Sequence, residues 1–357
     1  MLNVLIVDDS ALYRQVLKHV LEPIPDLAIV GVAKDGVEAV EMIKRLHPDL
    51  ITLDVQMPGL DGLGVLREIK RLGLKTQVLM VSSLTAAGSP ATVEALLFGA
   101  LDCILKPTGV SSQEARDILA GALGSRVDAL LDTRRARIGK VRAVLPPAET
   151  KPQTKPQGRR LPTGDCIAIG SSTGGPDALR RVLPLLPADL SVPIFIVQHM
   201  PVKFAESLAR RLDELTPFPV HLAETGMLVE PGHCYFAPGG LHLTVVKRSR
   251  GMVCRLVDEP PRHGCRPSVD VLLESLVDCY GERMVATILT GMGSDGLEGC
   301  RAVKAAGGAV VAQDQESCAV YGMPKAVVTA GLADVVLPLD TIGEVLSRGE
   351  YRRQVMP

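Results

Sequence analysis

The sequence predicts an α/β protein made of two doubly wound parallel-sheet domains. From the first residue onward, short apolar runs alternate with amphipathic helical stretches, the pattern produced when helices cover both faces of a parallel sheet. The alternation stops in a basic, proline-rich stretch near the middle of the chain and resumes beyond it. A chain of 357 residues is long enough for two such domains, each with its own core.

The first domain, expected over residues 1–123, shows a five-fold alternation of strand and helix. The expected strands are 3–7, 27–32, 50–53, 77–81 and 102–105. The expected helices are 10–22, 36–46, 62–72, 90–99 and 111–123.

A linker is expected over residues 124–162, followed by a second domain over 163–350. Between residues 134 and 164, nine lysines and arginines accompany a single acid, Glu149. We interpret this charge as solvation of the linker, with docking to an acidic partner as the alternative. The expected strands of the second domain are 166–169, 194–198, 285–290, 309–313 and 334–337, with a β-rich insert at 219–258.

Composition excludes several classes of function. The formal net charge is −1 and the chain has no Trp, so we expect no nucleic-acid partner. No apolar run approaches the roughly 18 residues of a spanning helix, and the N-terminal stretch lacks the features of a signal peptide. Eight scattered cysteines without a C-x-x-C pair indicate reduced thiols. We therefore expect a cytoplasmic protein without direct membrane insertion.

Polar side chains gather where the strands of the first domain end. Asp8 and Asp9 follow the first strand and Asp54 follows the third, at the sheet edge where open α/β sheets bind ligands. Converging carboxylates need a hard cation such as Mg²⁺. Ser82 ends the fourth strand, and Lys106 follows the fifth and can neutralise a phosphoryl group. The set is typical of an aspartyl-phosphate site with Asp54 as nucleophile.

The first domain resembles the receiver domains of two-component regulators. The similarity lies in VLIVDDS (4–10), LDVQMP (53–58) with DG (61–62), and KP (106–107). It implies a flavodoxin-like sheet of order 2-1-3-4-5 and phosphorylation of Asp54 by a histidine kinase. It also implies Mg²⁺ held by Asp9 and Asp54, a phosphoryl group sensed by Ser82 and Lys106, and a cis Lys106–Pro107 bond.

A glycine-rich turn, IGSSTGGPD (169–177), opens the second domain and has two interpretations. As a phosphate cradle it lacks the P-loop lysine, and Ser172 replaces the second glycine of G-x-G-x-x-G. As a nucleophile elbow, Gly170-x-Ser172-x-Gly174 matches G-x-S-x-G, whose small residues permit a tight turn. Ser171 is adjacent, but the elbow spacing favours Ser172.

A serine nucleophile needs a base and an orienting acid. His199 directly follows the apolar run 194–198, and Asp295 lies in LTGMGSDG (289–296), a second glycine-rich turn after an apolar run. The alternative role for Asp295 is an N-cap of the helix that follows. Ser172, His199 and Asp295 are all expected at the ligand-binding edge of the sheet. The chain order Ser-His-Asp differs from that of α/β-hydrolases, which indicates a different fold.

The second domain resembles the CheB family of chemotaxis methylesterases, in the motifs GSSTGG (170–175), QHMP (198–201), APGG (237–240), RPSVD (266–270), TGMGSDG (290–296) and YGMPK (321–325). The resemblance implies a Rossmann-like serine esterase without a cofactor, regulated by the attached receiver. Its substrates would be glutamate γ-methyl esters of methyl-accepting chemotaxis receptors, with glutamine deamidation as a second activity. We expect backbone N–H groups of Thr173 and Met292 to form the oxyanion hole.

Three other functions are weighed against this one. A DNA-binding regulator is disfavoured because nothing after residue 163 has the pattern of a compact three-helix unit. A dinucleotide-binding scaffold is disfavoured because no acid ends the strand at 194–198. An inactive interaction module is the third alternative.

Overall fold

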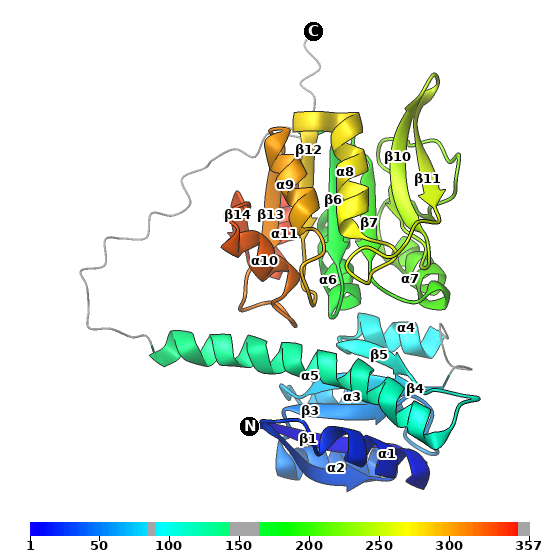
Figure 1. Ribbon diagram of the computed structural model, residues 1–357, viewed down its shortest axis with the longest axis vertical. Helices are drawn as coiled ribbons and strands as arrows, with labels where there is room; N and C mark the ends of the chain where they lie inside the picture. The colour runs from blue at the N-terminus through cyan, green and yellow to red at the C-terminus, as the bar shows by residue number, and fades with distance from the viewer. Residues whose placement is uncertain (84–89, 143–163, 349–357) are drawn as a thin grey trace. The chain divides into compact units, whose positions relative to one another are not determined.

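The computed structural model describes residues 1–83, 90–142 and 164–348. Within these ranges the chain forms two compact units, each built on its own parallel sheet (Figure 1). The two α/β parallel-sheet domains expected from the sequence are therefore confirmed. Residues 143–162 of the expected linker, and residues 163, 349 and 350 of the expected second domain, lie outside the described ranges.

The N-terminal domain has a parallel five-stranded sheet of order β2-β1-β3-β4-β5. This order agrees with the expectation drawn from the sequence motifs. Its elements are β1 (Leu2–Val7), α1 (Ala11–Leu21), β2 (Leu27–Ala33), α2 (Gly36–Leu46), β3 (Leu50–Asp54), α3 (Gly62–Arg71), β4 (Gln77–Ser82), α4 (Pro90–Leu97), β5 (Asp102–Leu105) and α5 (Ser112–Arg142).

Short polar side chains begin the helices that follow the central strands. Ser10 caps α1 by accepting a hydrogen bond from Tyr13 N, and Asp61 caps α3 by accepting one from Gly64 N at 2.7 Å. These caps occupy the first free N–H groups of each helix. Every residue of β3 is buried, as expected for a strand with helices on both faces. The polar residues at the strand ends are thereby held on rigid elements.

Two expectations for this domain are wrong. Helix α5 continues to Arg142, so the helix expected to end at residue 123 extends through residues 124–142 of the expected linker. Buried residues at helical spacing, Leu119, Leu123, Val127 and Leu130, extend its apolar face past the expected end at residue 123. Among the described residues the cis peptide bond is Arg266–Pro267, so Lys106–Pro107 is trans, the form most X-Pro bonds prefer.

The C-terminal domain has a seven-stranded parallel sheet of order β14-β13-β12-β6-β7-β9-β8 and a separate antiparallel hairpin. Its strands are β6 (Cys166–Ser171), β7 (Ile194–Gln198), β8 (Val220–Leu222), β9 (Cys234–Phe236), β10 (His242–Arg248), β11 (Gly251–Val257), β12 (Met284–Ile288), β13 (Ala309–Gln313) and β14 (Val335–Leu337). Its α-helices are α6 (Gly175–Val182), α7 (Val202–Leu215), α8 (Val269–Tyr280), α9 (Leu297–Ala305), α10 (Met323–Thr329) and α11 (Leu339–Arg348).

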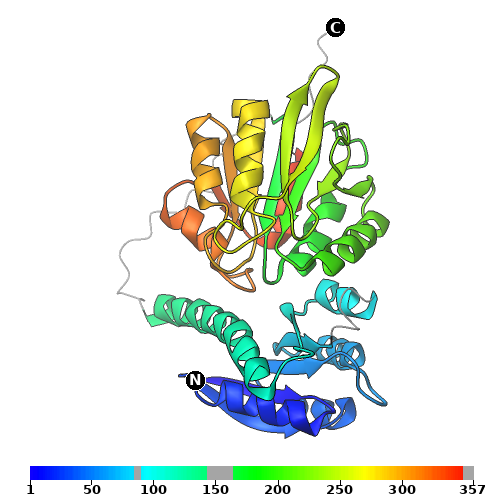
Figure 2. The ribbon, with the colours of Figure 1, turned by 45° about the vertical axis from the view of Figure 1, so that its right-hand side comes forward.

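The β-rich insert expected at 219–258 is only partly separate from the main sheet. Strands β8 and β9 join the parallel sheet, with β9 paired to β7. All three residues of β9 are buried, and burial on both faces requires a place inside a helix-covered sheet. Only β10 and β11 form a hairpin of their own, which extends beyond the end of the sheet in Figure 2.

The strand order of this domain reverses direction at β6. Its neighbours are β7, the next strand along the chain, and β12, which comes much later. Ligands bind at such a switch point, beyond the carboxyl ends of the strands. Figure 1 shows α8 and α9 on one face of the sheet and α11 on the other, so the fold is doubly wound. Loops at the carboxyl ends of β6, β7 and β12 therefore define the candidate site.

No helix among residues 1–83, 90–142 and 164–348 has both the length and the apolar character needed to cross a bilayer.

Candidate active site

The glycine-rich turn after β6 exposes one of its two serines. Ser171 is fully buried and its Oγ donates a hydrogen bond to Gln198 Oε1 at 2.6 Å. Ser172 is half-buried and directly follows the strand. A Cβ at Gly170 would lie 2.6 Å from Val269 Cγ1, so only glycine permits this close packing of the turn. Of the two serines, Ser172 is the one whose hydroxyl remains available.

Gln198 joins the serine turn to the neighbouring strand. Residues Ser171 and Gln198 are partners in the β6–β7 pairing. Beyond its contact with Ser171, the Gln198 amide Nε2 donates to the carbonyls of Ser172 at 2.9 Å and of His199 at 3.0 Å. Gln198 is 2% exposed, so these bonds form away from water. The side chain thus fixes the backbone around both Ser172 and His199.

His199 lies between an acid and a thiol. Its Nε2 is 2.7 Å from Asp295 Oδ2, and its Nδ1 is 3.6 Å from Cys265 Sγ. Because Asp295 engages Nε2, Nδ1 is the ring nitrogen left to accept a proton from a nucleophile. Ser172 follows β6 beside it, but among the described residues no hydrogen bond joins Ser172 Oγ to His199. Such bonds are commonly formed only in the substrate complex.

Asp295 is held at the N-terminus of α8. Its Oδ1 accepts hydrogen bonds from Ser268 Oγ at 2.8 Å and from the backbone N–H groups of Asp270 and Gly296. Its Oδ2 accepts one from Val269 N at 2.7 Å in addition to the bond with His199. Helix α9 instead has Gly296 as its N-cap, with no side-chain cap, so Asp295 does not cap the helix that follows it. The N–H groups and dipole at the start of α8 favour the ionised carboxylate.

This environment shifts the pKa values of the pair in opposite directions. Burial disfavours the charged form of His199, but hydrogen bonds to Asp295 and Cys265 outweigh it and raise the pKa to about 9. Burial likewise opposes ionisation of Asp295, yet the bonds from His199 and the α8 backbone lower its pKa below the ordinary value. The arrangement therefore stabilises an imidazolium–carboxylate pair, the charge state that a general base forms after accepting a proton.

The loop after β12 closes around the serine turn. Ser172 N donates to Thr290 O at 3.0 Å, so this N–H is not available to a substrate oxygen. A Cβ at Gly291 would lie 2.8 Å from Ser172 Cβ, which places the next residue, Met292, beside the serine turn. Thr173, directly after Ser172, is buried and Met292 is half-buried. That the backbone N–H groups of these two residues form the oxyanion hole stays a prediction.

The structure also brings together the polar residues expected in the N-terminal domain. Carboxylate oxygens of Asp8, Asp9 and Asp54 all lie within 4.8 Å of one another. The Lys106 ammonium is 2.8 Å from Asp8 Oδ2 and 2.7 Å from Asp54 Oδ2. Ser82 is buried at the end of the adjacent strand β4. Burial raises the pKa of Asp8, and the hydrogen bond with Lys106 opposes this rise.

These acids suit a magnesium ion. Mg²⁺ takes oxygen ligands and uses one or two carboxylates together with phosphate oxygens and waters. Asp9 is exposed whereas Asp8 and Asp54 are buried, so the cluster opens to solvent on the Asp9 side. The Lys106 ammonium is the positive charge that contacts the buried carboxylates of Asp8 and Asp54, and one positive charge does not balance two negative ones. The donor set therefore fits Mg²⁺ held by Asp8, Asp9 and Asp54.

Three residues around Ser172, His199 and Asp295 were not assigned a role from the sequence. Ser268 lies in the RPSVD motif, and a serine before an apolar helical pattern indicates an N-cap. Gln198 lies in QHMP, and nothing in the local sequence indicates a role for its side chain. Cys265 is 66 residues from His199 in the chain, and no local pattern predicts their contact.

Comparisons with known proteins identify the family of each domain. Residues 167–346 match the family model "CheB methylesterase", and residues 4–116 match "Response regulator receiver domain". Proteins named "Protein-glutamate methylesterase/protein-glutamine glutaminase" from Symbiobacterium thermophilum and Thermotoga maritima are each 43% identical to this chain. Both matches cover 97% of this chain, with 96% and 97% of the relative.

A solved structure supports the same assignment for the C-terminal domain. The CheB methylesterase catalytic domain of Thermotoga maritima matches with 44% identity and a TM-score of 0.51. The match covers 52% of this chain and 97% of that one. The family models, the relatives and the fold thus agree with one another on both domains. The chain belongs to the CheB methylesterase family, with a response regulator receiver domain at its N-terminus.

Proposed function

We propose that this protein is a phosphorylation-regulated serine esterase that hydrolyses glutamate γ-methyl esters on methyl-accepting chemotaxis receptors. The observation that carries this proposal is the His199–Asp295 pair, hydrogen-bonded at 2.7 Å at the sheet edge that carries Ser172. A neutral His199 can accept the serine proton, and Asp295 stabilises the cation that results. The names of the full-length relatives support glutamate esters as the substrate class.

In the first half of the reaction, Ser172 Oγ attacks the ester carbonyl carbon as its proton moves to His199 Nδ1. The negative charge that develops on the carbonyl oxygen is stabilised by the backbone N–H groups of Thr173 and Met292, one such donor being worth roughly 3 kcal/mol. The C–O bond to the methoxy group then breaks, and His199 returns the proton so that methanol leaves. A glutamyl ester of Ser172 remains.

In the second half, His199 Nδ1 takes a proton from water as the water oxygen attacks the glutamyl ester. Collapse of the second tetrahedral intermediate breaks the bond to Ser172 Oγ, which recovers a proton from His199. The product is a glutamate side chain. A glutamine amide passes through the same kind of intermediate with ammonia as the leaving group, so the same residues support deamidation.

Phosphorylation is proposed at Asp54 in the receiver domain. A carboxylate oxygen of Asp54 attacks phosphorus, and the bond from phosphorus to the histidine of the donor kinase breaks. Lys106 neutralises charge on the phosphoryl oxygens, and Ser82 contacts them. Mg²⁺ held by Asp8, Asp9 and Asp54 would supply charge neutralisation when bound.

The receiver is proposed to inhibit the esterase until it is phosphorylated. A phosphoryl group on Asp54 favours the arrangement of the protein in which the esterase is not inhibited. Such a shift requires that the phosphoryl group interact more favourably with one arrangement than with the other. The partners are chemotaxis receptors and the histidine kinase of their pathway, and the enzyme acts in the cytoplasm without a cofactor of its own.

We expect methanol release from methylated receptor fragments to rise when Mg²⁺ and a small phosphodonor are added to the full chain. Release is measured with and without the donor for the native protein and for Asp54→Asn. The variant keeps the shape of the side chain but has no carboxylate to phosphorylate. Its rate of methanol release is therefore expected to be the same with and without the donor. A native rate that does not respond would contradict the regulatory half of the proposal. Absence of release in every condition would contradict the esterase.

The pH dependence of kcat/KM follows from the pKa of His199. A base must be neutral to accept the serine proton, and a pKa of about 9 leaves most of the imidazole protonated at pH 7. We therefore expect kcat/KM to rise by about tenfold per pH unit below pH 8 and to level off near the pKa. Methanol release is measured at constant ionic strength, with the Ser172→Ala rate subtracted as uncatalysed hydrolysis. A plateau already reached below pH 7 would contradict the raised pKa.

A further inference from the structure

The thiol of Cys265 lies against the nitrogen of His199 that catalysis needs. Cys265 Sγ is 3.6 Å from Nδ1, while Asp295 occupies Nε2 on the other side of the ring. Ligand atoms of the three side chains lie within 4.8 Å of one another. The esterase mechanism uses no thiol as a reactant, and Cys265 enters it only through its effect on the pKa of His199.

The spacing of sulfur and nitrogen matches the edge of a tetrahedral metal site. Zinc binds cysteine sulfur at about 2.3 Å and histidine nitrogen at about 2.0–2.1 Å, which places the two atoms about 3.6 Å apart in a tetrahedron. We propose that Cys265 Sγ and His199 Nδ1 form a binding site for a thiophilic divalent cation such as Zn²⁺, and that the bound ion inhibits the esterase.

The surroundings of His199 are those of a metal ligand. Histidines that bind metals usually donate their other ring N–H to a carboxylate, which fixes the tautomer and makes the free nitrogen more basic. Asp295 provides this contact at 2.7 Å. It is 2% exposed and is itself held by Ser268 Oγ and the start of α8. The lone pair of Nδ1 is thereby directed toward Cys265.

Cys265 is held in place by a tight turn. Its N–H donates to Arg262 O at 2.8 Å, and Arg262 N donates back to Cys265 O at 3.0 Å. His263 and Gly264, the residues between them, both have positive φ. Cys265 is half-buried, which leaves room for water to complete the coordination of an ion. The ligand pair is therefore largely ordered before an ion binds.

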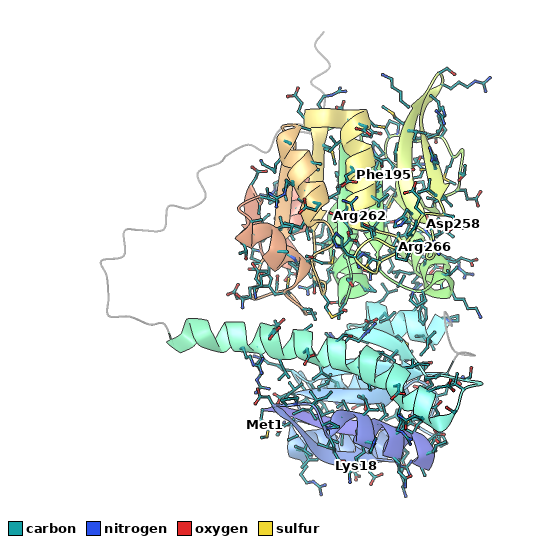
Figure 3. All side chains as sticks on the ribbon, viewed as in Figure 1. Met1, Lys18, Phe195, Asp258, Arg262 and Arg266 are labelled. Carbon is teal, nitrogen blue, oxygen red and sulfur yellow. The ribbon has the colours of Figure 1, made fainter. Side chains whose placement is uncertain are left out.

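Nearby positive charges do not oppose a cation at this position. Arg262 and Arg266, which are labelled in Figure 3, flank Cys265 in the chain. Arg262 pairs with Glu274 at 2.5 Å, and Arg266 pairs with Asp258 at 2.6 Å. Both guanidinium groups are thus neutralised by carboxylates.

Binding of the ion removes the base from the reaction. The metal–sulfur and metal–nitrogen bonds form as the thiol releases its proton to solvent, together with the imidazole proton where one is present. Nδ1 then has no lone pair for the proton of Ser172. The inhibitory consequence rests on the proposed esterase function, whereas the binding itself does not.

Cobalt binding tests the site without an activity assay. The full chain is freed of metal with a chelator and titrated with Co²⁺, whose bond to thiolate absorbs in the near ultraviolet. We expect the band in the native protein and in Cys279→Ser, and no band in Cys265→Ser. Cys279 is the matched control because it is the other half-buried thiol. Co²⁺ on the carboxylates of the receiver gives no thiolate band.

Zinc inhibition of methanol release then links the site to catalysis. Each variant is compared with its own rate in the presence of chelator. We expect Zn²⁺ to inhibit the native protein and Cys279→Ser, and removal of one ligand in Cys265→Ser to weaken inhibition by roughly tenfold or more. His199→Gln serves only in the cobalt titration, where we expect it to weaken binding.

The proposal is overturned if the native protein shows no thiolate band, or if the band persists in Cys265→Ser. It is also overturned if His199→Gln binds Co²⁺ with the affinity of the native protein. Zinc inhibition that is undiminished in Cys265→Ser contradicts it as well. If no methanol is released by any sample, the esterase function fails, and the cobalt titration still decides whether the metal site exists.

Discussion

Replacing Ser172 with alanine is expected to lower kcat for methanol release by roughly 10⁴-fold or more, as removal of a nucleophile does in other serine hydrolases. The reason is that the neighbouring serine, Ser171, is not available for attack. Ser171 is fully buried and donates its proton to Gln198 Oε1. The measurement is single-turnover methanol release, with mass spectrometry to detect the glutamyl intermediate on the tryptic peptide that contains residue 172.

Ser171→Ala is the matched control for this prediction. It leaves the buried Gln198 Oε1 without its donor, which costs about 1–3 kcal/mol of folding free energy, and it does not touch the proposed nucleophile. Its kcat is expected to stay within an order of magnitude of the native value. If Ser171→Ala abolishes turnover while Ser172→Ala retains it, the two serines have been assigned in the wrong order.

Asp295→Asn is expected to lower kcat by about 10⁴-fold, because it reverses the tautomer of His199. Oδ1 of Asp295 accepts three hydrogen bonds, whereas Oδ2 accepts those of His199 and Val269 N. An asparagine at position 295 is expected to place its oxygen at the Oδ1 position, because three hydrogen-bond donors point there. Its NH₂ group then faces His199 Nε2. The imidazole then accepts at Nε2 and carries its proton on Nδ1, where it cannot receive the proton of Ser172.

Asp270→Asn provides the comparison within the same cluster. Asp270 is also fully buried, and its Oδ1 accepts a hydrogen bond from Gly299 N that an asparagine oxygen can keep. It does not contact His199, and burial already raises the pKa of its carboxyl group. We expect a loss of less than about tenfold, consistent with an isosteric change that leaves the tautomer intact. The tautomer is read directly from the ¹⁵N chemical shifts of His199. Equal losses in the two variants would show that the tautomer is not the cause.

The sequence alone determined the two parallel sheets and the edge at which the chemistry gathers. Strand and helix periods are local properties, and a residue that ends or directly follows a buried parallel strand, as Asp54 and His199 do, must lie at the carboxyl edge. For the same reason the strands at 194–198 and 309–313 were predicted with the bounds that the structure shows. The end of α5 was misplaced because its apolar face continues into a stretch whose charge resembles a linker.

Only the tertiary structure decided which atoms meet. Which serine is free depends on Gln198, 27 residues from Ser171, and which nitrogen of His199 can act depends on Asp295, 96 residues away. The contact of Cys265 with that histidine joins two loops that share no pattern in the sequence. Hydrogen bonds at this range are set by strand order and loop packing, which a local sequence pattern does not specify.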